Sequence, residues 1–440
     1  MKYSRRSRLM RCSASRLLAC LLCINTSALA GGPLVLLGPD GQTPVNYQNP
    51  NIVINVEGGN LGTLSNATAD TLVTQAFALW NAVDSATVNL QLDQDPLRFD
   101  VNFENYQDYL PNLGTNVYKD DDNINPLIYD SNGEIIDAYL GAGQSDFTIG
   151  FAASIINITV DDSHFSEGYA VINGKDLQMS NSDLMLLIAH EIGHFLGLDH
   201  SQGDIDNRET EYGIPRICKS SVEDRYPLMY PFICRTKQAL HSDDITAISA
   251  LYPVADLDRR FGILQGFFLN TDGSPLPGAN IWAENITTGN VYSIVSDYLT
   301  EGTGYYKLYL PAGNYTLHAN SINPLFNGGS SIGPYASDSG DLSFQSPHPI
   351  SPVAYHDAGG NDAVITISAG QNVSINFSSQ GTDTIPQPLA DNPASASASK
   401  NDSLGDIFFG ASSVLNLLLG LFILLLRRLN RHFSGLPENG

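Results

Sequence analysis

Three histidines and one glutamate stand at the spacing that a catalytic metal ion requires. His190, Glu191, His194 and His200 meet the pattern H-E-x-x-H-x-x-G-x-x-H at every fixed position, in a chain of 440 residues with 9 histidines. Residues four apart share one face of a helix, so His190 and His194 can face one ion with Glu191 beside it. Gly197 can adopt a left-handed conformation that ends the helix and turns His200 back toward the ion.

The chemistry that this set favours is metal-assisted hydrolysis. Three neutral imidazoles bind Zn²⁺ and leave one coordination position for water. Zinc lowers the pKa of that water and polarises a carbonyl group, and Glu191 is placed to act as general base and to pass the proton to a leaving amine. We therefore expect one catalytic zinc ion, with Glu191 as the catalytic residue and with three ligands, His190, His194 and His200.

A helix is expected to carry the first two histidines. Ser180 and Ser182 are both candidates for its N-cap. Its buried face would be formed by Leu184, Met185, Leu187 and Ile188. Upstream, residues 71–83 have the apolar spacing of a second helix, and residues 125–130 have the pattern of a strand that ends in a turn. The pattern indicates an α+β domain built around the motif.

The residues around the motif resemble the metzincin clan of zinc peptidases, and within it the matrixin (matrix-metalloproteinase-like) branch. The resemblance covers about residues 50–253 and rests on Leu187-Ile188-Ala189, His200-Ser201, Leu228-Met229-Tyr230-Pro231 and the run 242–253. It implies a catalytic domain at 66–255 with a twisted mixed sheet and an active-site helix, and endopeptidase activity on proteins or peptides. It also implies that Met229 lies in a tight turn beneath the metal, and that residues 147–152 form the edge of the substrate cleft.

Two further expectations concern the loops of this domain. Cys218 and Cys234 flank the turn at Met229 and would pair in an oxidising compartment, which loop-closure estimates value at about 3 kcal/mol, although two unpaired thiols are the alternative. Acidic clusters at 120–122, 130–137 and 204–206 could bind Ca²⁺. None of them has the ligand order of an EF-hand, and acidic loops are usually solvated without binding an ion.

The rest of the chain predicts several separate segments. Residues 1–30 have the basic start, apolar centre and Ala28-Leu29-Ala30 end of a signal peptide, and residues 31–65 would be an N-terminal extension. Residues 260–380 alternate like an all-β unit, and the words D-G-S-P-L-P-G-A, G-Y-Y-K-L and P-A-G-N-Y-T-L resemble the carboxypeptidase regulatory-like β-sandwich family. Such a sandwich would serve as a spacer, or it would bind a partner.

The C-terminal segments predict an anchor. Residues 381–404 are rich in Pro, Ala, Ser and Asp, as in a flexible linker. Residues 405–428 contain an apolar run of the length of a bilayer core, followed by a basic cytoplasmic tail at 429–440. We expect a C-terminal transmembrane helix, or a sorting helix that is removed, with the catalytic domain exported to the extracytoplasmic side, in the periplasm or at the cell surface.

The charge of the chain limits its partners. The formal net charge is −24 at pH 7, which argues against nucleic acid and against anionic membrane surfaces. The sequence thus predicts an exported zinc endopeptidase acting on extracytoplasmic proteins. The alternative is a non-catalytic surface protein whose β-sandwich binds a partner, but a silent metal site would have no need of Glu191.

Overall fold

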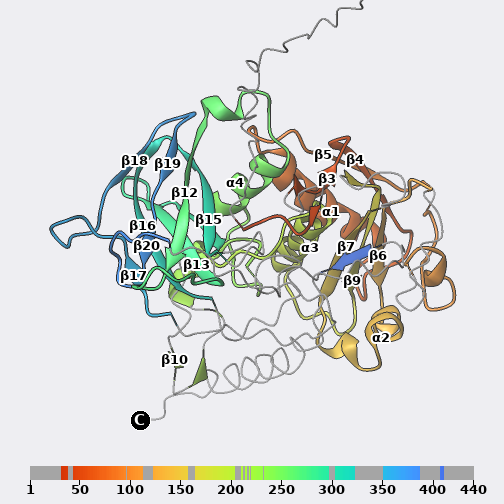
Figure 1. Ribbon diagram of the computed structural model, residues 1–440. Coiled ribbons are helices and arrows are strands. Elements are labelled where there is room, and N and C mark those ends of the chain that lie inside the picture. The colour runs from red at the N-terminus through yellow and green to blue at the C-terminus, as the bar shows by residue number, and fades with distance from the viewer. Residues whose placement is uncertain are drawn as a thin grey trace, which may run out of the picture.

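A six-stranded mixed sheet forms the centre of the first half of the chain in the computed structural model (Figure 1). The strand order is β21-β7-β9-β6-β4-β5. Four of the strands are parallel, whereas β7 is antiparallel to β9 and to β21. The bounds are β4 (Asn51–Val56), β5 (Asn89–Asp93), β6 (Pro126–Asp130), β7 (Gly150–Ile156), β9 (Glu167–Asn173) and β21 (Ile407–Gly410). The structure describes residues 31–37, 43–95, 97–111, 122–156, 164–203, 210–211, 214–215, 218, 220–230, 232–296, 303–322, 350–386 and 407–410.

Both faces of this sheet are covered, as the nearly continuous apolar runs of its central strands require. On one face, Leu127 and Tyr129 pack under α1 (Asn66–Asn81) and α3 (Asn181–Phe195). On the other face, Ile128 of the same strand packs with α2 (Glu134–Leu140). Successive side chains of β6 therefore enter two different cores, because strand residues alternate between faces.

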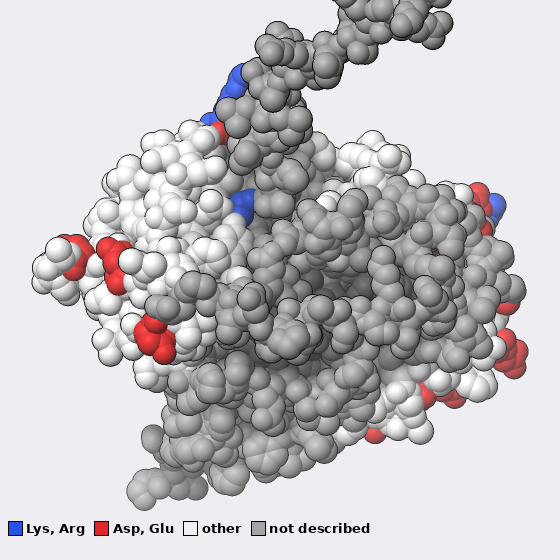
Figure 2. Space-filling model, in the orientation of Figure 1, with Lys and Arg blue, Asp and Glu red and all other residues white. Residues whose placement is uncertain are grey.

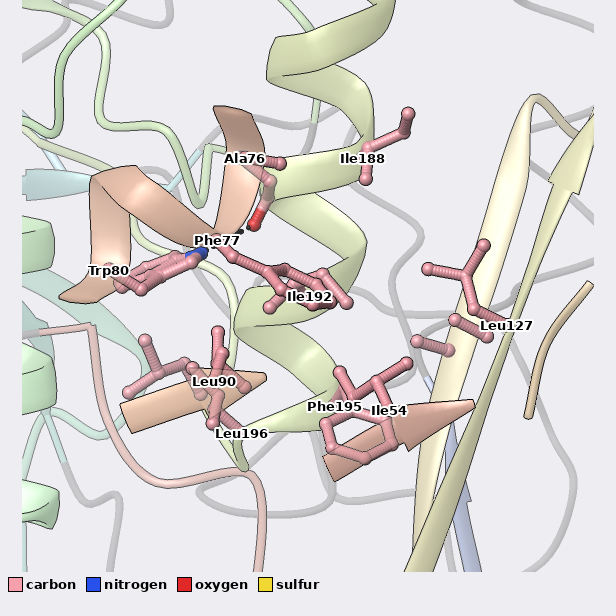
Figure 3. Close-up of a cluster of buried hydrophobic side chains, with 14 of the residues drawn as sticks. Ile54, Ala76, Phe77, Trp80, Leu90, Leu127, Ile188, Ile192, Phe195 and Leu196 are labelled. Atoms are coloured by element: carbon pink, nitrogen blue, oxygen red, sulfur yellow. Dashed lines mark hydrogen bonds between the residues drawn. The ribbon is translucent and has the colours of Figure 1, made fainter. Parts of the chain in front are cut away.

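The helices α1 and α3 pack against each other in the core of this unit (Figure 3). Each begins at a serine: the Oγ atoms of Ser65 and Ser180 accept backbone N–H groups of the first helical turn. Trp80 at the end of α1 is fully buried, and its indole Nε1 donates to Ala189 O at 2.9 Å. This contact places the C-terminal half of α3, where the histidine motif lies, against α1.

Shorter elements complete the unit. Strand β4 belongs to the range 31–65, so residues expected to form an N-terminal extension supply an inner strand of the sheet. Helix α4 (Ser242–Leu251) closes the unit and begins at His241 with a capping box. The remaining short strands are β1 (Leu36–Leu37), β2 (Thr43–Pro44), β3 (Asn46–Tyr47), β8 (His164–Phe165), β10 (Thr210–Glu211) and β11 (Ile214–Pro215). Short 3₁₀ helices lie at Tyr106–Asp108, Gln144–Asp146, Ser220–Arg225 and Leu257–Arg259.

The second half of the chain forms two further sheets that share a core of their own. One has the order β15-β12-β19 with β20 also on β12, and the other has the order β14-β13-β16-β17 with β18 also on β16. The alternation in β15 buries Tyr306, Leu308 and Leu310 in this core. The bounds are β12 (Phe261–Leu269), β13 (Ala279–Asn285), β14 (Val291–Val295), β15 (Tyr305–Pro311), β16 (Gly313–Ser321), β17 (Val353–Ala354), β18 (Ile365–Ile367), β19 (Asn372–Ser374) and β20 (Phe377–Ser378).

The two units are in direct contact. Helix α4 lies between them in Figure 1 and packs on β14 and β15. Ser242 Oγ at the start of α4 donates to Val291 O of β14 at 2.9 Å, and Tyr309 of β15 packs against the core of the first unit. The two-sheet unit that runs from β12 to β20, called the β unit below, therefore packs on the first unit through apolar and polar contacts. In Figure 2, acidic side chains are visible over both units on the face shown.

The prediction of a membrane anchor at 405–428 is wrong for the part of that segment that the structure describes. Residues Ile407–Gly410 form strand β21, which pairs antiparallel with β7. None of the helices among the described residues is long and apolar enough to cross a bilayer. The predicted location, in which a C-terminal transmembrane helix anchors the protein, is therefore contradicted by the described residues. The predicted signal peptide (1–30), most of the linker and the basic tail (429–440) lie outside the described residues.

Candidate metal centre

Helix α3 and the turn after it bring the three histidines together. His190 and His194 lie on the last turns of α3, which ends at Phe195, and Gly197 two residues later has φ +92°. The N–H of Gly197 donates to His194 O and the N–H of Leu198 donates to Gly193 O, which is the Schellman pattern. The reversal at Gly197 returns the chain so that His200 faces the two helical histidines.

The ring nitrogens of the three histidines converge on one point. His194 Nε2 lies 3.1 Å from His190 Nε2 and 3.1 Å from His200 Nε2. Two nitrogens bound to one tetrahedral zinc ion are about 3.3 Å apart, given Zn–N distances of about 2.0–2.1 Å. Among the described residues, this triad is the only group of histidine, cysteine and carboxylate side chains with the spacing of a metal site.

The opposite ring nitrogens identify the tautomers of the two helical histidines. His190 Nδ1 lies 2.7 Å from Leu228 O, and His194 Nδ1 lies 2.8 Å from Leu198 O. A carbonyl oxygen can only accept, so each Nδ1 carries the proton and each Nε2 presents a lone pair to the other. Lone pairs 3.1 Å apart repel unless a cation lies between them. The donor set therefore fits a metal ion bound through Nε2 atoms.

Burial favours the neutral, metal-binding form of all three imidazoles. It lowers the pKa of His190 to about 4, and it lowers the pKa values of His194 and His200 well below the ordinary value of 6.5. Neighbouring histidines lower the last two further through repulsion between charged forms. At neutral pH the three rings are uncharged, which is the form that can bind a metal ion.

The Glu191 carboxyl is buried next to the start of strand β7. A Cβ atom added to Gly150 would lie 3.2 Å from Glu191 Cγ and 3.3 Å from Glu191 Oε1, so a larger residue there would require the Glu191 side chain to shift. Burial raises the pKa of Glu191 to about 8, and a nearby cation would lower it. Of the range 147–152, expected at the cleft edge, Gly150–Ala152 lie in β7, and Gly150 lies close to the Glu191 side chain.

Comparisons with known proteins add little to this geometry. No family model matches the chain, and no curated protein sequence matches it. Among solved structures, it is similar to a leucine-rich repeat protein from Bacteroides thetaiotaomicron, at 10% identity with a TM-score of 0.15. That match covers 29% of this chain and 14% of the other, a likeness too slight to carry an argument. The assignment therefore depends on the site itself.

Met229 lies against helix α3, which carries His190 and His194. Its side chain is buried, and a Cβ on Gly193 would collide with its Sδ atom. The turn around it is held by Asp244, whose two carboxylate oxygens accept the N–H groups of Leu228 (2.8 Å) and Met229 (3.0 Å). Since Leu228 O accepts from His190, Asp244 acts on the orientation of His190 through this turn.

A second carboxylate of α4 holds the segment after His200. Asp243 is fully buried and accepts a hydrogen bond from Ser201 Oγ, while Ser201 N donates to Met229 O at 2.8 Å. The run 242–253 carried part of the resemblance in the sequence, but these roles of Asp243 and Asp244 were not predicted. The signal was available in two adjacent acidic residues at a helix start, but their partners lie far away in the chain.

The structure joins Cys218 and Cys234 in a disulfide, with the two Cα atoms 5.2 Å apart. The bridge encloses the turn at Met229. The acidic loops have other partners where they are described: both Asp130 oxygens accept backbone N–H groups, from Gly133 and Ile136. Residues 120, 121, 204 and 206, also considered for calcium, lie outside the described residues.

Proposed function

We propose that this protein is a zinc-dependent endopeptidase. The observation that carries the proposal is the convergence of three buried Nε2 atoms, two of them fixed as lone-pair donors by carbonyls, beside a buried glutamate. His190, His194 and His200 would hold the ion. Bound zinc supplies an activated water and polarises a carbonyl group.

The residues of the chain itself would perform the proton transfers. Glu191 accepts a proton from the attacking water and delivers it to the nitrogen of the leaving amine. Burial raises the pKa of Glu191 to about 8, and a bound cation would lower this pKa again, which favours the ionised carboxylate that accepts the first proton. The low polarity around Glu191 strengthens its interaction with any charge that forms there.

An extended peptide would bind along β7. Gly150, at the start of this strand, lies close to Glu191. Among the described residues, the outer edge of Gly150–Ala152 has no paired strand, because β21 pairs with Ala153–Ile156. Main-chain hydrogen bonds to such an edge recognise a peptide without requiring particular side chains. The position of the β7 edge beside Glu191, together with the turn at Met229 and helix α4, supports a matrixin-like arrangement of the catalytic domain.

Glu191→Ala tests the proposal. We expect the full chain loaded with Zn²⁺ to cut a peptide library, and the variant to lose activity by about 10²–10⁴-fold while it binds Zn²⁺ as the wild type does. Glu134→Ala, at an exposed position in α2, is the matched control and should cut normally. Unchanged cleavage by Glu191→Ala would reject the mechanism. Zinc binding without cleavage by the wild type would favour a non-catalytic binding protein.

A further inference from the structure

A serine of the β unit lies at the centre of the contact between the two units. Ser293, in β14, is fully buried. Its Oγ accepts the N–H of Gly203 at 3.0 Å and lies 3.0 Å from Ser201 Oγ and 3.2 Å from Asp243 Oδ2. Its own N–H donates to Asp243 Oδ1 at 2.6 Å. One hydroxyl and one amide of the β unit thus contact three residues of the first unit.

A second side chain of the β unit binds the same loop through the carbonyl group of Gly203. Asn280, in β13, is fully buried, and its Nδ2 donates to Gly203 O at 2.8 Å. Gly203 therefore has its N–H bound by Ser293 and its carbonyl bound by Asn280. Residues with a side chain rarely adopt its φ of +60°, and a Cβ there would lie 3.0 Å from Pro227 Cδ, so this position requires glycine.

The loop that is held in this way follows the third metal ligand. His190 and His194 belong to helix α3, whose backbone fixes their directions, whereas His200 lies beyond the helix on the path to Ser201 and Gly203. On its N-terminal side, Asp199 N donates to Gly32 O at 3.2 Å. On its C-terminal side, the anchors are Met229, Asp243 and the two residues of the β unit.

We propose that the β unit is part of the metal-binding machinery, with Ser293 and Asn280 as positioning residues that hold the loop 201–203 and thereby aim His200. This inference rests on the proposed zinc site. The β unit is then more than a spacer, because loss of its two hydrogen bonds to Gly203 loosens the one metal ligand that no helix carries. Outer residues that orient metal ligands change metal affinity by about 10–100-fold when they are replaced.

The test compares Ser293→Ala with Ser296→Ala in the full chain. Ser296 is an equally buried serine of the same unit, and its Oγ accepts Ala279 N and donates to Leu276 O, both at or below 2.9 Å, within the β unit. Affinity for Zn²⁺ is measured by competition with a chelator, the absorption spectrum of bound Co²⁺ reports the ligand geometry, and thermal unfolding reports stability. Asn280→Ala is a second variant, needed if Ser293→Ala does not fold.

We expect Ser293→Ala and Asn280→Ala to weaken Zn²⁺ binding about tenfold or more and to change the Co²⁺ spectrum. Ser296→Ala should lower the melting temperature without either effect. Equal Zn²⁺ affinities and Co²⁺ spectra in all variants would overturn the inference. A wild-type chain that binds neither ion would overturn the inference and the proposed function together. A wild-type chain that binds zinc but cuts nothing would reject only the proposed function, since the affinity comparison would still decide the inference.

Discussion

Burial, more than neighbouring charge, determines the pKa values of the single residues at the proposed site. Burial lowers the pKa values of the three site histidines and raises the pKa of Glu191, and no ion pair among the described side chains reaches this group. The site thus holds three neutral imidazoles and a carboxyl group with a pKa of about 8, and a bound cation would stabilise the ionised form of this carboxyl group. The same physical effect acts on buried carboxyl groups outside the site.

Glu57 gives the clearest dependence of stability on pH. It is fully buried, and burial raises its pKa from 4.5 to about 8, although N–H groups of Val101 and Tyr129 favour the charged form. The folded state holds this proton more tightly than the unfolded state, so the contribution is complete below pH 4.5 and is lost as the pH rises through 8.

We expect Glu57→Gln to remove that contribution. Between pH 4.5 and 8 the free energy of unfolding of the wild type should fall relative to the variant by up to about 1.4 kcal/mol per pH unit. Denaturant unfolding at several pH values measures both slopes. Glu134→Gln, at an exposed site, should keep the slope of the wild type. Identical slopes for Glu57→Gln and wild type would show that the carboxyl is ionised throughout.

At this scale, sequence spacing selected residues that lie together in the structure. These residues are close together in the sequence, because His190, Glu191 and His194 share one helix and His200 follows a few residues after that helix ends. The supporting groups could not be found in this way. Asp243 and Ser293 reach the site across 42 and 92 residues from Ser201, and no local pattern encodes such contacts.

Secondary-structure elements position the site through close helix packing. Helix α3 passes Trp80 of α1 and Met229 of the following turn at Gly193, where a Cβ would lie 3.0 Å from Trp80 Cζ2 and would overlap Met229 Sδ. The helix thus approaches its neighbours more closely than a larger residue allows. A glycine in a helix interior costs about 1 kcal/mol relative to alanine, and the packing offsets this cost.

We therefore expect Gly193→Ala to destabilise the protein despite the better helix propensity of alanine. Overpacking in a core costs about 1–3 kcal/mol. Chemical denaturation of Gly193→Ala, Met229→Ala and the double variant tests the cause. Because Met229→Ala removes the colliding sulfur, the two changes together should cost less than the sum of the single costs, with a coupling of at least about 0.5 kcal/mol. Strict additivity would mean that Met229 is not what excludes a side chain at position 193.

Elements were harder to predict where an apolar run lacked a clear period. Strand β6 was predicted at 125–130 because a turn follows it, whereas the apolar centre of β9, residues 169–172, does not distinguish a strand from a buried helix. The same ambiguity explains the error at Ile407–Gly410, where apolar composition indicated a helix and the structure has a strand on the edge of β7. Strand pairing depends on a partner about 250 residues away in the chain, which composition does not contain.

At the scale of the whole molecule, contacts between residues far apart in the sequence connect Gly31, the β unit and β21 to the region of the proposed site. Gly31 N donates to Ser293 O, the β unit holds the loop after His200, and β21 pairs with β7. The register sets Gly410 opposite Ala153 and Ile407 opposite Ile156, in the antiparallel direction. An extended substrate that pairs with Gly150–Ala152 and continues along the same edge would have to displace β21.

This competition predicts that a chain ending at residue 403, which lacks β21, binds extended peptides better than the full chain. The KM for a peptide long enough to pair with all of β7 should fall several-fold, with kcat unchanged, because the chemistry at Glu191 is the same and only the access to the strand edge differs. A short peptide confined to Gly150–Ala152 is the control and should show one KM in both chains. A synthetic peptide of residues 404–412, added to the shortened chain, should raise the KM of the long substrate again, as a competitor for the edge. If the long substrate has the same KM in both chains, then β21 and the substrate do not share this edge, and the peptide must leave β7 before Ala153.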